Sequence, residues 1–318
     1  MKVTIVVRTF KRPEFLKQAL SSIQLQTHKD WEVILFDDSG STENLNIYNT
    51  FKAYNPTKRI VYITSATPYD MFKDSWTISP KLSKGELIVR LDDDDLLTET
   101  SIEFIVSTYI KNPSLDFSYG SATFFENDEL RSKITTQTPI EAPKTVDIWE
   151  GYLHEHPYNL PWRFKHNHHE TPQYHSSIIH CSKANHMCVY HTYVMRVSSI
   201  LKVIDKIEVT SNFVDDLEAM GIMDYLGLSH TSIKKTLTYA RIHNNGRVTD
   251  SKGNGEDTLW NNILRIRDDV ENYRTKGFQS NIYPNSIEGD ENDEITDYQR
   301  QRFSEYLSKI KNNSKTLG

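Results

Sequence analysis

Four consecutive carboxylates, Asp92 to Asp95, follow the short apolar run 87–89, which predicts a buried parallel strand. Adjacent negative charges repel one another, so such a run is tolerated when it is solvated, paired with cations or bound to a metal. The spacing Asp92-x-Asp94 offers the oxygen ligands that suit Mg²⁺ or Mn²⁺, especially when a diphosphate completes the coordination shell. A solvated acidic turn is the alternative, because charge runs usually lie on the surface. The place after a strand, where open α/β sheets bind ligands, favours the metal site.

Two further pairs of neighbouring acids accompany this run. Asp37 and Asp38 end the apolar segment 31–36, and Asp215 and Asp216 open a predicted helix. Acids at such positions also have structural uses, because they cap backbone turns and complement the positive end of a helix dipole. The pairs are therefore candidates for ligand contacts or proton transfer, with these structural uses as the alternatives.

The elements that must position these acids alternate along the chain. Apolar, β-branched runs predict strands, and amphipathic spacing predicts the helices between them. This alternation is typical of a doubly wound α/β fold, a mostly parallel sheet flanked by helices. The expected strands are 3–7, 31–36, 59–64, 87–89, 117–125, 187–193 and 236–242, and the expected helices are 13–23, 44–54, 98–110, 195–207, 214–225, 259–273 and 298–310. A partly helical connection is expected at 71–82, and residues 134–172 lack clear periodicity.

Composition narrows the functional classes. The net charge of −6 over 318 residues gives no support to a general nucleic-acid-binding surface, although a local basic groove stays open. Cys181 and Cys188 are too few for a disulfide framework, which favours a reducing compartment. The first apolar run is broken at Arg8 and is too short for a signal peptide, and no stretch approaches the roughly twenty apolar residues of a membrane span. We therefore expect a cytoplasmic protein with no membrane span.

Five motifs, taken together and in this order, resemble those of the inverting family 2 glycosyltransferases of the GT-A fold. They are similar to that family's first-strand Thr-Tyr-Asn-Arg signature, its Gln-Thr linker and second strand with paired Asp, its Gly-Glu-Tyr-Ile strand with a metal motif, its Glu-Asp base motif and its Tyr-Arg-x-His motif. In this chain they are Arg8 to Arg12, Gln24 to Asp38, Lys84 to Asp95, Val214 to Leu217 and Tyr239 to His243.

The resemblance covers residues 1–250 and implies a domain organisation. A GT-A glycosyltransferase domain would span 1–250, with a nucleotide-binding half at 1–97 and an acceptor half at 98–250. A C-terminal helical extension would follow at 251–318, and it contains the acidic segment 288–297, which we expect to be mobile.

The phosphate-binding cation is the position where the chain departs most from the family. Trp76 falls near where the family often has an Arg that meets phosphate, which leaves Lys73 and Lys81 as nearby candidates. Arg241 and Arg247 could also meet phosphate. The other departures are Phe10 for Tyr, Lys11 for Asn, the order Ser39-Gly40, and Glu99 for Pro.

The resemblance implies roles for the metal and the donor. Asp94, helped by Asp92, would hold Mn²⁺ or Mg²⁺ against the leaving diphosphate, with His243 as a further ligand. Asp38 would accept the N3 proton of a uracil, and Phe10 would stack on the ring; backbone capping and core packing are their alternatives. The other implied nucleotide-binding residues are Arg8, Thr9, Arg12, Asp92 and Asp93.

The resemblance also implies a general base. Asp216 would take the proton of the acceptor hydroxyl as its oxygen attacks the anomeric carbon from the face opposite the diphosphate, which inverts the configuration. Asp215 would raise the pKa of its neighbour if both were buried, and the choice between the two acids stays open.

The region 154–191 holds nine of the twelve histidines. It lacks the ligand spacing of a structural zinc site, so we expect a wall that binds the acceptor through flat rings and hydrogen bonds. The implied acceptor-binding residues are Asp95, Trp162, His186 and His191.

A metal-dependent, inverting hexosyl- or pentosyltransferase that uses a UDP-sugar is therefore expected. Its acceptor is a hydroxyl, on a glycan by default, with a nucleic-acid base or a protein as the other options. A nucleotidyltransferase that forms nucleotide-sugars is one alternative, but the loop 8–12 has no glycine to grip a triphosphate. A non-catalytic nucleotide- or carbohydrate-binding module is the other, although a binder needs no Asp215-Asp216 pair.

Overall fold

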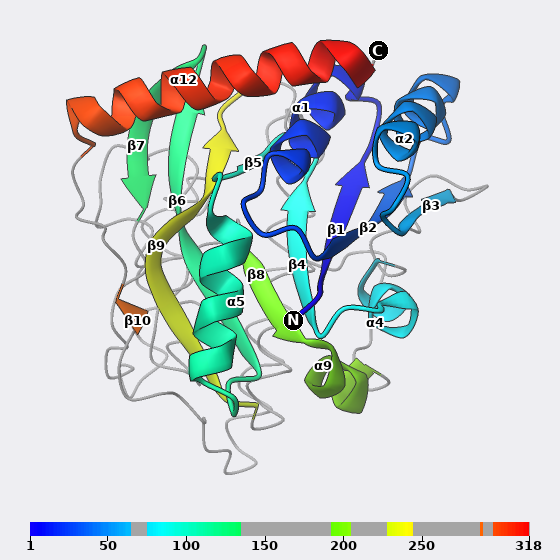
Figure 1. The fold of residues 1–318 in the computed structure, drawn as a ribbon, viewed down its shortest axis with the longest axis vertical. Helices are drawn as coiled ribbons and strands as arrows, with labels where there is room; N and C mark the ends of the chain where they lie inside the picture. Colours follow the sequence, from blue (N-terminus) through cyan, green and yellow to red (C-terminus); the bar gives the residue numbers. More distant parts are fainter. Residues whose placement is uncertain (65–74, 135–191, 205–227, 244–286, 289–294, 318) are drawn as a thin grey trace, which may run out of the picture.

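The computed structural model describes residues 1–64, 75–134, 192–204, 228–243, 287–288 and 295–317. Its strands are β1 Val3–Thr9, β2 Trp31–Asp37, β3 Ile60–Thr64, β4 Leu87–Asp92, β5 Leu96–Leu97, β6 Phe117–Glu126, β7 Glu129–Ile134, β8 Tyr193–Arg196, β9 His230–Arg241 and β10 Ile287–Glu288. Its α-helices are α1 Pro13–Gln24, α2 Thr42–Tyr54, α4 Ser79–Leu82, α5 Ser101–Lys111, α9 Val197–Val203 and α12 Asp297–Ser314. The strands form one sheet in the order β10-β9-β6-β8-β4-β1-β2-β3, with β5 beside β9 and β7 beside β6 (Figure 1).

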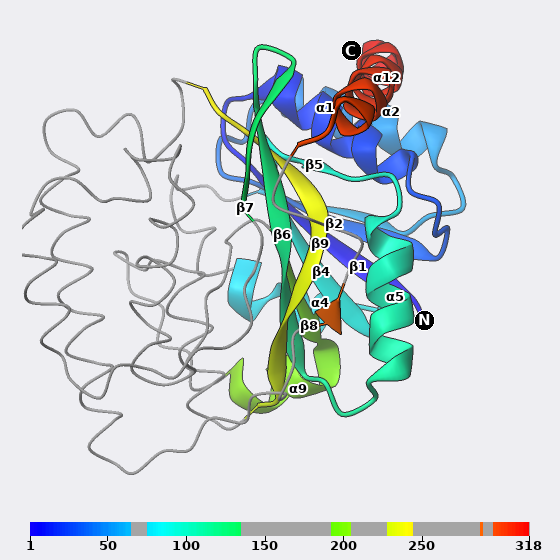
Figure 2. The ribbon, with the colours of Figure 1, turned by 90° about the vertical axis from the view of Figure 1, so that its left-hand side faces the viewer.

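Strands β1 to β4 form the parallel half of the sheet. Alternate residues of β1 enter different hydrophobic clusters: Val3 and Ile5 pack with residues of α1, while Val6 packs with Trp76. Burial on both faces is typical of a parallel sheet and explains the unbroken apolar runs. Helices α1, α2, α5 and α12 lie on one face, and α4 and α9 on the other (Figure 2). The doubly wound, parallel-rich α/β fold expected from the sequence is therefore confirmed.

The register of these strands gathers their carboxyl ends at one edge. Arg8 in β1 pairs with Asp92 in β4 on one side, and Thr9 pairs with Asp37 in β2 on the other. This edge is where a doubly wound sheet binds its ligands.

Antiparallel pairing begins at β8, which lies between β4 and β6. Strand β6 pairs in parallel with β9 and then turns back into β7 through Asn127 and Asp128. Both turn residues have positive φ, 49° and 69°, which Asn and Asp tolerate better than most residues. The sequence analysis missed this hairpin.

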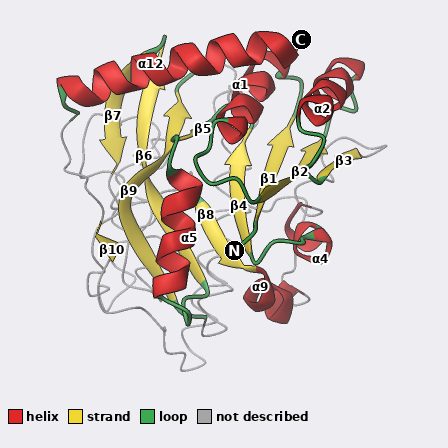
Figure 3. Cartoon of the chain, in the orientation of Figure 1, coloured by secondary structure: helices red, strands yellow, loops and turns green. Residues whose placement is uncertain are grey.

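Helix α12 lies on the same face of the sheet as α1 and contacts α1 and β7 (Figure 3). Thr296 and Gln299 form a capping box at its start, so its first backbone donors are satisfied. Phe303 and Tyr306 then pack in a cluster that includes Leu96 and Phe125. The C-terminal helix expected at 298–310 is thus present, and it packs on the sheet.

Several boundaries differ from the expected ones. The strand expected at 87–89 runs on to Asp92, because its ladder with β1 continues to Arg8. The helix expected at 98–110 begins at Ser101. Of the strand expected at 187–193 and the helix expected at 195–207, residues 187–191 and 205–207 lie outside the described residues, and the described part forms β8 and α9. The irregular stretch 135–172, the helices 214–225 and 259–273 and the residues 289–294 of the acidic segment lie outside the described residues. Within the described part of the chain, no helix is long and apolar enough to cross a membrane.

Candidate active site

The four acids Asp92 to Asp95, at the carboxyl end of β4 and in the turn after it, lie in different environments. The Asp92 side chain is 49% exposed and accepts a hydrogen bond from Arg8 Nη2 at 3.1 Å. Asp93 has no exposed surface, Asp94 is 17% exposed, and Asp95 is buried. The Asp95 N–H donates to the Asp92 carbonyl at 3.2 Å, which closes a tight turn. The turn therefore presents Asp92 and Asp94 to solvent and buries the other two.

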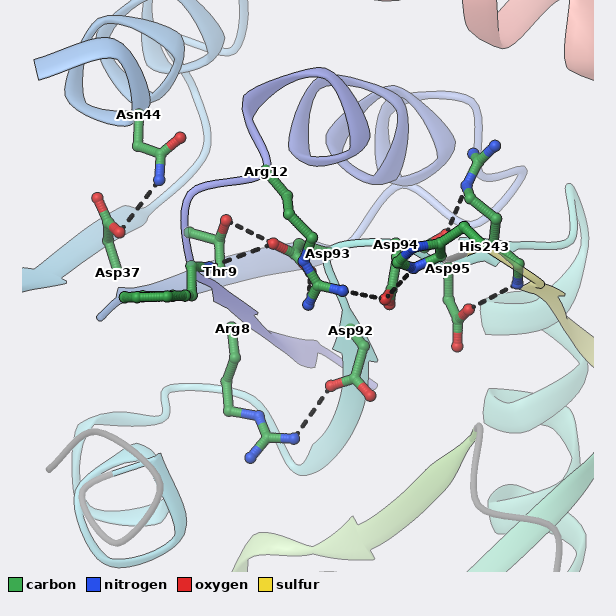
Figure 4. Close-up of polar contacts among 12 residues, drawn as sticks. Arg8, Thr9, Arg12, Asp37, Asn44, Asp92, Asp93, Asp94, Asp95 and His243 are labelled. Atoms are coloured by element: carbon green, nitrogen blue, oxygen red, sulfur yellow. Dashed lines mark hydrogen bonds and ion pairs between the residues drawn. The ribbon is translucent and has the colours of Figure 1, made fainter. Parts of the chain in front are cut away.

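Asp93 fixes the loop that follows β1. Its Oδ2 accepts hydrogen bonds from the Thr9 hydroxyl at 2.6 Å and the Phe10 N–H at 3.3 Å, and its Oδ1 pairs with Arg12 Nη2 at 2.5 Å (Figure 4). Burial raises the pKa of Asp93, and the charge of Asp94 raises it further; Arg12 and Thr9 oppose this, and the pKa lies at about 8. Asp93 was expected to touch the nucleotide, and the structure places it beneath Thr9 and Phe10, where it holds their loop.

Asp94 contacts the side chains of Arg12 and His243. Its Oδ2 contacts Arg12 Nη1 and lies 3.0 Å from His243 Nε2 (Figure 4). Burial raises the pKa of Asp94, but the hydrogen bond from His243 and the charge of Arg12 outweigh it and lower the pKa below its ordinary value. Asp94 is therefore ionised at neutral pH, as a metal ligand must be.

The acids at this turn fit a divalent ion. One carboxylate oxygen from each of Asp92, Asp94 and Asp95 lies within 4.8 Å of the others. Such an oxygen set suits Mg²⁺ or Mn²⁺, and the imidazole of His243 beside Asp94 adds a donor that suits Mn²⁺. Asp95 was expected on the acceptor side, whereas here its Oδ1 accepts the Arg241 N–H at 3.0 Å.

Arg241 contacts the same turn and also helix α1. Its Nε donates to the Asp94 carbonyl at 3.0 Å, and its Nη2 donates to Gln18 Oε1 at 2.7 Å. Its guanidinium lies 4.6 Å from the ring centre of Phe15 and 4.4 Å from that of Phe125. Arg241 was a candidate for binding phosphate; in this structure its side chain joins β9 to α1 and the acidic turn.

Asp37 and Asp38, at the carboxyl end of β2, make different contacts. The Asp37 carboxylate is buried and accepts hydrogen bonds from the Ser39 N–H and the Tyr62 hydroxyl. It also accepts one from the Asn44 amide, so it anchors the start of α2 (Figure 4). Burial and this carboxylate raise the pKa of Tyr62 above its ordinary value. Asp38 is 9% exposed, and its N–H donates to the Thr9 carbonyl at 3.0 Å. This contact places Asp38 beside the loop that carries Phe10.

The order Ser39-Gly40 has a backbone reason. Gly40 has φ +57°, and a Cβ there would lie 3.2 Å from Thr64 Oγ1. Glycine reaches this left-handed conformation without steric cost, so the turn into α2 places it here. The departure from the family's usual order is therefore compatible with the same loop.

Trp76 belongs to the hydrophobic core, which excludes it from a surface role. It is 1% exposed, and the guanidinium of Arg90 lies 4.0 Å above its ring. Arg90 is itself buried and donates to Ser75 Oγ at 3.3 Å. Of the two lysines proposed for phosphate, Lys81 is exposed and Lys73 lies outside the described residues.

The second half of the expected site lies outside the described residues. It comprises the candidate base pair Asp215 and Asp216, the acceptor candidates Trp162, His186 and His191, and the phosphate candidate Arg247. Gln18, Phe15 and Asn44 were not expected at the site. No local pattern marks Gln18 and Phe15, because their contacts depend on residues far along the chain. Asn44 could have been found as a short polar residue in the first turn of a helix, near an acid that needs a donor.

The parallel-rich α/β sheet, with acids suited to a divalent ion at the carboxyl end of β4, has the architecture of a glycosyltransferase of the GT-A type. The comparisons with known proteins agree. The family model described as Glycosyl transferase family 2 matches residues 4–181, which is more than half of the 318 residues. The chain belongs to this family.

Two curated relatives illustrate the range of similarity. Poly(ribitol-phosphate) beta-N-acetylglucosaminyltransferase TarP of Staphylococcus aureus (strain N315) is 31% identical over 37% of this chain and 36% of its own length. The UDP-Glc:alpha-D-GlcNAc-diphosphoundecaprenol beta-1,3-glucosyltransferase WfgD of Escherichia coli is 22% identical over 45% of this chain and 54% of its own length. The matches therefore span about a third to a half of these relatives.

Solved structures share the fold. S. aureus TarS 1-349 in complex with UDP-GlcNAc has a TM-score of 0.54 at 13% identity, over 87% of this chain and 74% of its own. The mannosyltransferase PcManGT from Pyrobaculum calidifontis, in complex with GDP-Man and Mn²⁺, has a TM-score of 0.50 at 9% identity, over 97% of this chain and 85% of its own. At these identities the likeness supports the GT-A fold alone.

Proposed function

We propose that this chain is a metal-dependent, inverting glycosyltransferase that moves a sugar from a UDP-sugar to a hydroxyl acceptor. The observation that carries the proposal is the cluster of Asp92, Asp94 and Asp95, whose oxygens lie within 4.8 Å of one another at the carboxyl end of β4. Family membership supplies the reaction class, and the cluster supplies a place for the divalent ion that offsets the charge of a leaving diphosphate.

The chain's own residues would bind and orient the donor at this edge. Asp92 and Asp94, with Asp95 and His243 beside them, would hold Mn²⁺ or Mg²⁺. Asp38 would accept the N3 proton of the uracil, and its hydrogen bond to the loop after β1 supports this placement. Phe10 would stack on the base, and Arg8, Thr9 and Arg12 would line the nucleotide, with Asp93 supporting them from below.

The base and the acceptor site rest on the resemblance of the motifs. Asp216 would remove the proton of the acceptor hydroxyl, and Asp215 would tune the pKa of its neighbour. Trp162, His186 and His191 would form the acceptor wall beside Asp95. This arrangement assigns the donor to residues 1–97, the acceptor to residues 98–250 and a helical extension to residues 251–318.

The relatives suggest which substrates to test first. TarP is named as an N-acetylglucosaminyltransferase that acts on poly(ribitol-phosphate), and TarS was solved with UDP-GlcNAc. UDP-GlcNAc is therefore the first donor to try, and hydroxyls of glycans or of polyol-phosphate polymers are the first acceptors. The scarcity of cysteine supports a reducing compartment, and we place the protein in the cytoplasm.

An assay for the products separates the proposal from its alternatives. The protein is incubated with Mn²⁺ and a panel of UDP-sugars, with and without acceptors, and the release of UDP and pyrophosphate is measured. A transferase releases UDP, and EDTA abolishes the release. A nucleotidyltransferase given UTP and a sugar phosphate releases pyrophosphate instead, and a binding module releases neither.

A further inference from the structure

Arg241 contacts the acidic turn through both its main chain and its side chain. Its N–H donates to Asp95 Oδ1, and its Nε donates to the Asp94 carbonyl, each at 3.0 Å. One residue at the end of β9 thus fixes two neighbouring acids, through its main chain and its side chain. These are two of the three acids whose oxygens cluster closely enough to share an ion.

The far end of the Arg241 side chain is fixed as well. Nη2 donates to Gln18 Oε1 in α1 at 2.7 Å, and the guanidinium lies between the rings of Phe15 and Phe125. The planar guanidinium presents donors at fixed angles and packs its faces on aromatic rings, which an ammonium group cannot do. Arg241 therefore acts as a rigid strut between α1 and the turn.

Arg241 also orients His243, through Phe15. The rings of Phe15 and His243 meet edge to face with centres 4.8 Å apart, so Phe15 contacts both Arg241 and the imidazole. The imidazole Nε2 in turn lies 3.0 Å from Asp94 Oδ2. A shift of Arg241 would therefore move Asp94 through its carbonyl and His243 through Phe15.

We propose that Arg241 is a positioning residue that holds Asp94 and His243 in the arrangement that binds the divalent ion. The proposal rests on the metal dependence proposed above and deepens it. It departs from the expectation that Arg241 meets phosphate, because Nε and Nη2 already donate to the protein and the guanidinium packs against two aromatic rings. Partners that orient metal ligands in this way typically change metal affinity by about 10–100-fold when removed.

The test measures Mn²⁺ affinity in the full-length protein without donor, by electron paramagnetic resonance of free Mn²⁺. Arg241→Gln and Arg241→Lys should each weaken Mn²⁺ binding by about 10–100-fold. Lys should fail to rescue, because one ammonium group cannot reproduce the two donors. Gln18→Leu removes only the hydrogen bond from Arg241 to α1 and leaves the packing on Phe15, so it should weaken binding in the same direction by less. The matched control is Arg300→Gln, which removes an exposed Arg of α12 that donates to the Leu130 carbonyl in β7.

A second readout separates positioning from phosphate binding. UDP affinity is measured by calorimetry in EDTA, where the metal makes no contribution, and it should be equal in wild type and Arg241→Gln. A folded Arg241→Gln variant with unchanged Mn²⁺ affinity overturns the proposal, and so does a loss of UDP affinity in EDTA. If that variant does not fold, unchanged Mn²⁺ affinity in Gln18→Leu has the same force. A wild-type protein that binds no Mn²⁺ refutes the metal dependence itself, which is a different failure.

Discussion

Replacing Asp94 with Asn tests the metal site directly, because it removes one negative charge without changing the size of the side chain. Asp94 is the acid whose pKa is lowered by its partners, and it is partly exposed beside Asp92. We expect Asp94→Asn to abolish turnover and to remove the effect of Mn²⁺ on UDP affinity. Removing a residue that orients a metal ligand typically lowers metal affinity by about 10–100-fold, and losing the ligand itself should lower it further.

The cost of this substitution to stability can be bounded from the contacts. Asp94 makes two charge-assisted contacts, with Arg12 and with His243. The substitution removes the carboxylate charge from both contacts, while Arg12 stays charged, and each contact loses about 1–1.5 kcal/mol. Two contacts give about 2–3 kcal/mol, from which the relief of repulsion among the acids is subtracted. The folded protein should therefore survive, with a melting temperature lower by a few degrees.

The assay follows UDP release and UDP binding across a Mn²⁺ titration, with the melting temperature of each variant measured in the same buffer. Asp128→Asn is the control, because Asp128 is an exposed, ion-paired acid on the β6–β7 turn. The control should behave as wild type in every measurement. Full turnover in Asp94→Asn, or wild-type turnover that EDTA leaves intact, would refute the assignment of Asp94 to the metal.

Three further predictions address the uracil, the base and the C-terminal helix. Asp38→Ala should erase a preference for UDP over ADP and GDP, and equal affinities of the wild type for the three nucleotides by calorimetry contradict the uracil assignment. Asp216→Asn should lower turnover by about 10²–10⁴-fold at unchanged UDP-sugar affinity, and Asp215→Asn should be milder; a lower melting temperature with intact turnover would mark Asp216 as structural. Tyr306→Phe removes the hydroxyl that donates to the Leu97 carbonyl at 2.8 Å, which should lower the free energy of unfolding in urea by about 1–3 kcal/mol. Burial raises the pKa of Tyr306 well above its ordinary value, so wild-type stability should fall as pH rises through about 10, and the variant should lose that part of the fall.

The layout of the sheet could be predicted because its signals are local. Strands β1, β2 and β4 are apolar runs buried on both faces, and the helices repeat their apolar residues at a spacing that one segment reveals. Strand ends were less predictable, because they depend on partners: Asp92 joins β4 only through its pairing with Arg8 in β1. The β6–β7 hairpin was missed although Asn127 and Asp128 are typical turn residues, since the segment that follows lacks a clear alternation.

The candidate site divides in the same way. The sequence located the acidic turn but could not distinguish the four acids, because their order along the chain says nothing about burial. Asp93 became a buried support only because Thr9 and Arg12 lie above it, more than eighty residues earlier in the chain. The pairing of Arg241 with Gln18 joins residues 223 positions apart, which no local pattern encodes.

Cations from distant parts of the chain explain how four adjacent carboxylates are tolerated at one strand end. Arg8 pairs with Asp92, while Arg12 serves both Asp93 and Asp94, so neighbouring acids share cations instead of facing each other alone. The two acids respond differently: burial and the charge of Asp94 raise the pKa of Asp93, whereas the hydrogen bond from His243 and the charge of Arg12 outweigh burial and lower the pKa of Asp94. The arrangement therefore concentrates ionised oxygen at the solvent side of the turn and support at its buried side. A divalent ion needs the ionised oxygens on the solvent side, and the loop that would carry the nucleotide needs the buried support of Asp93.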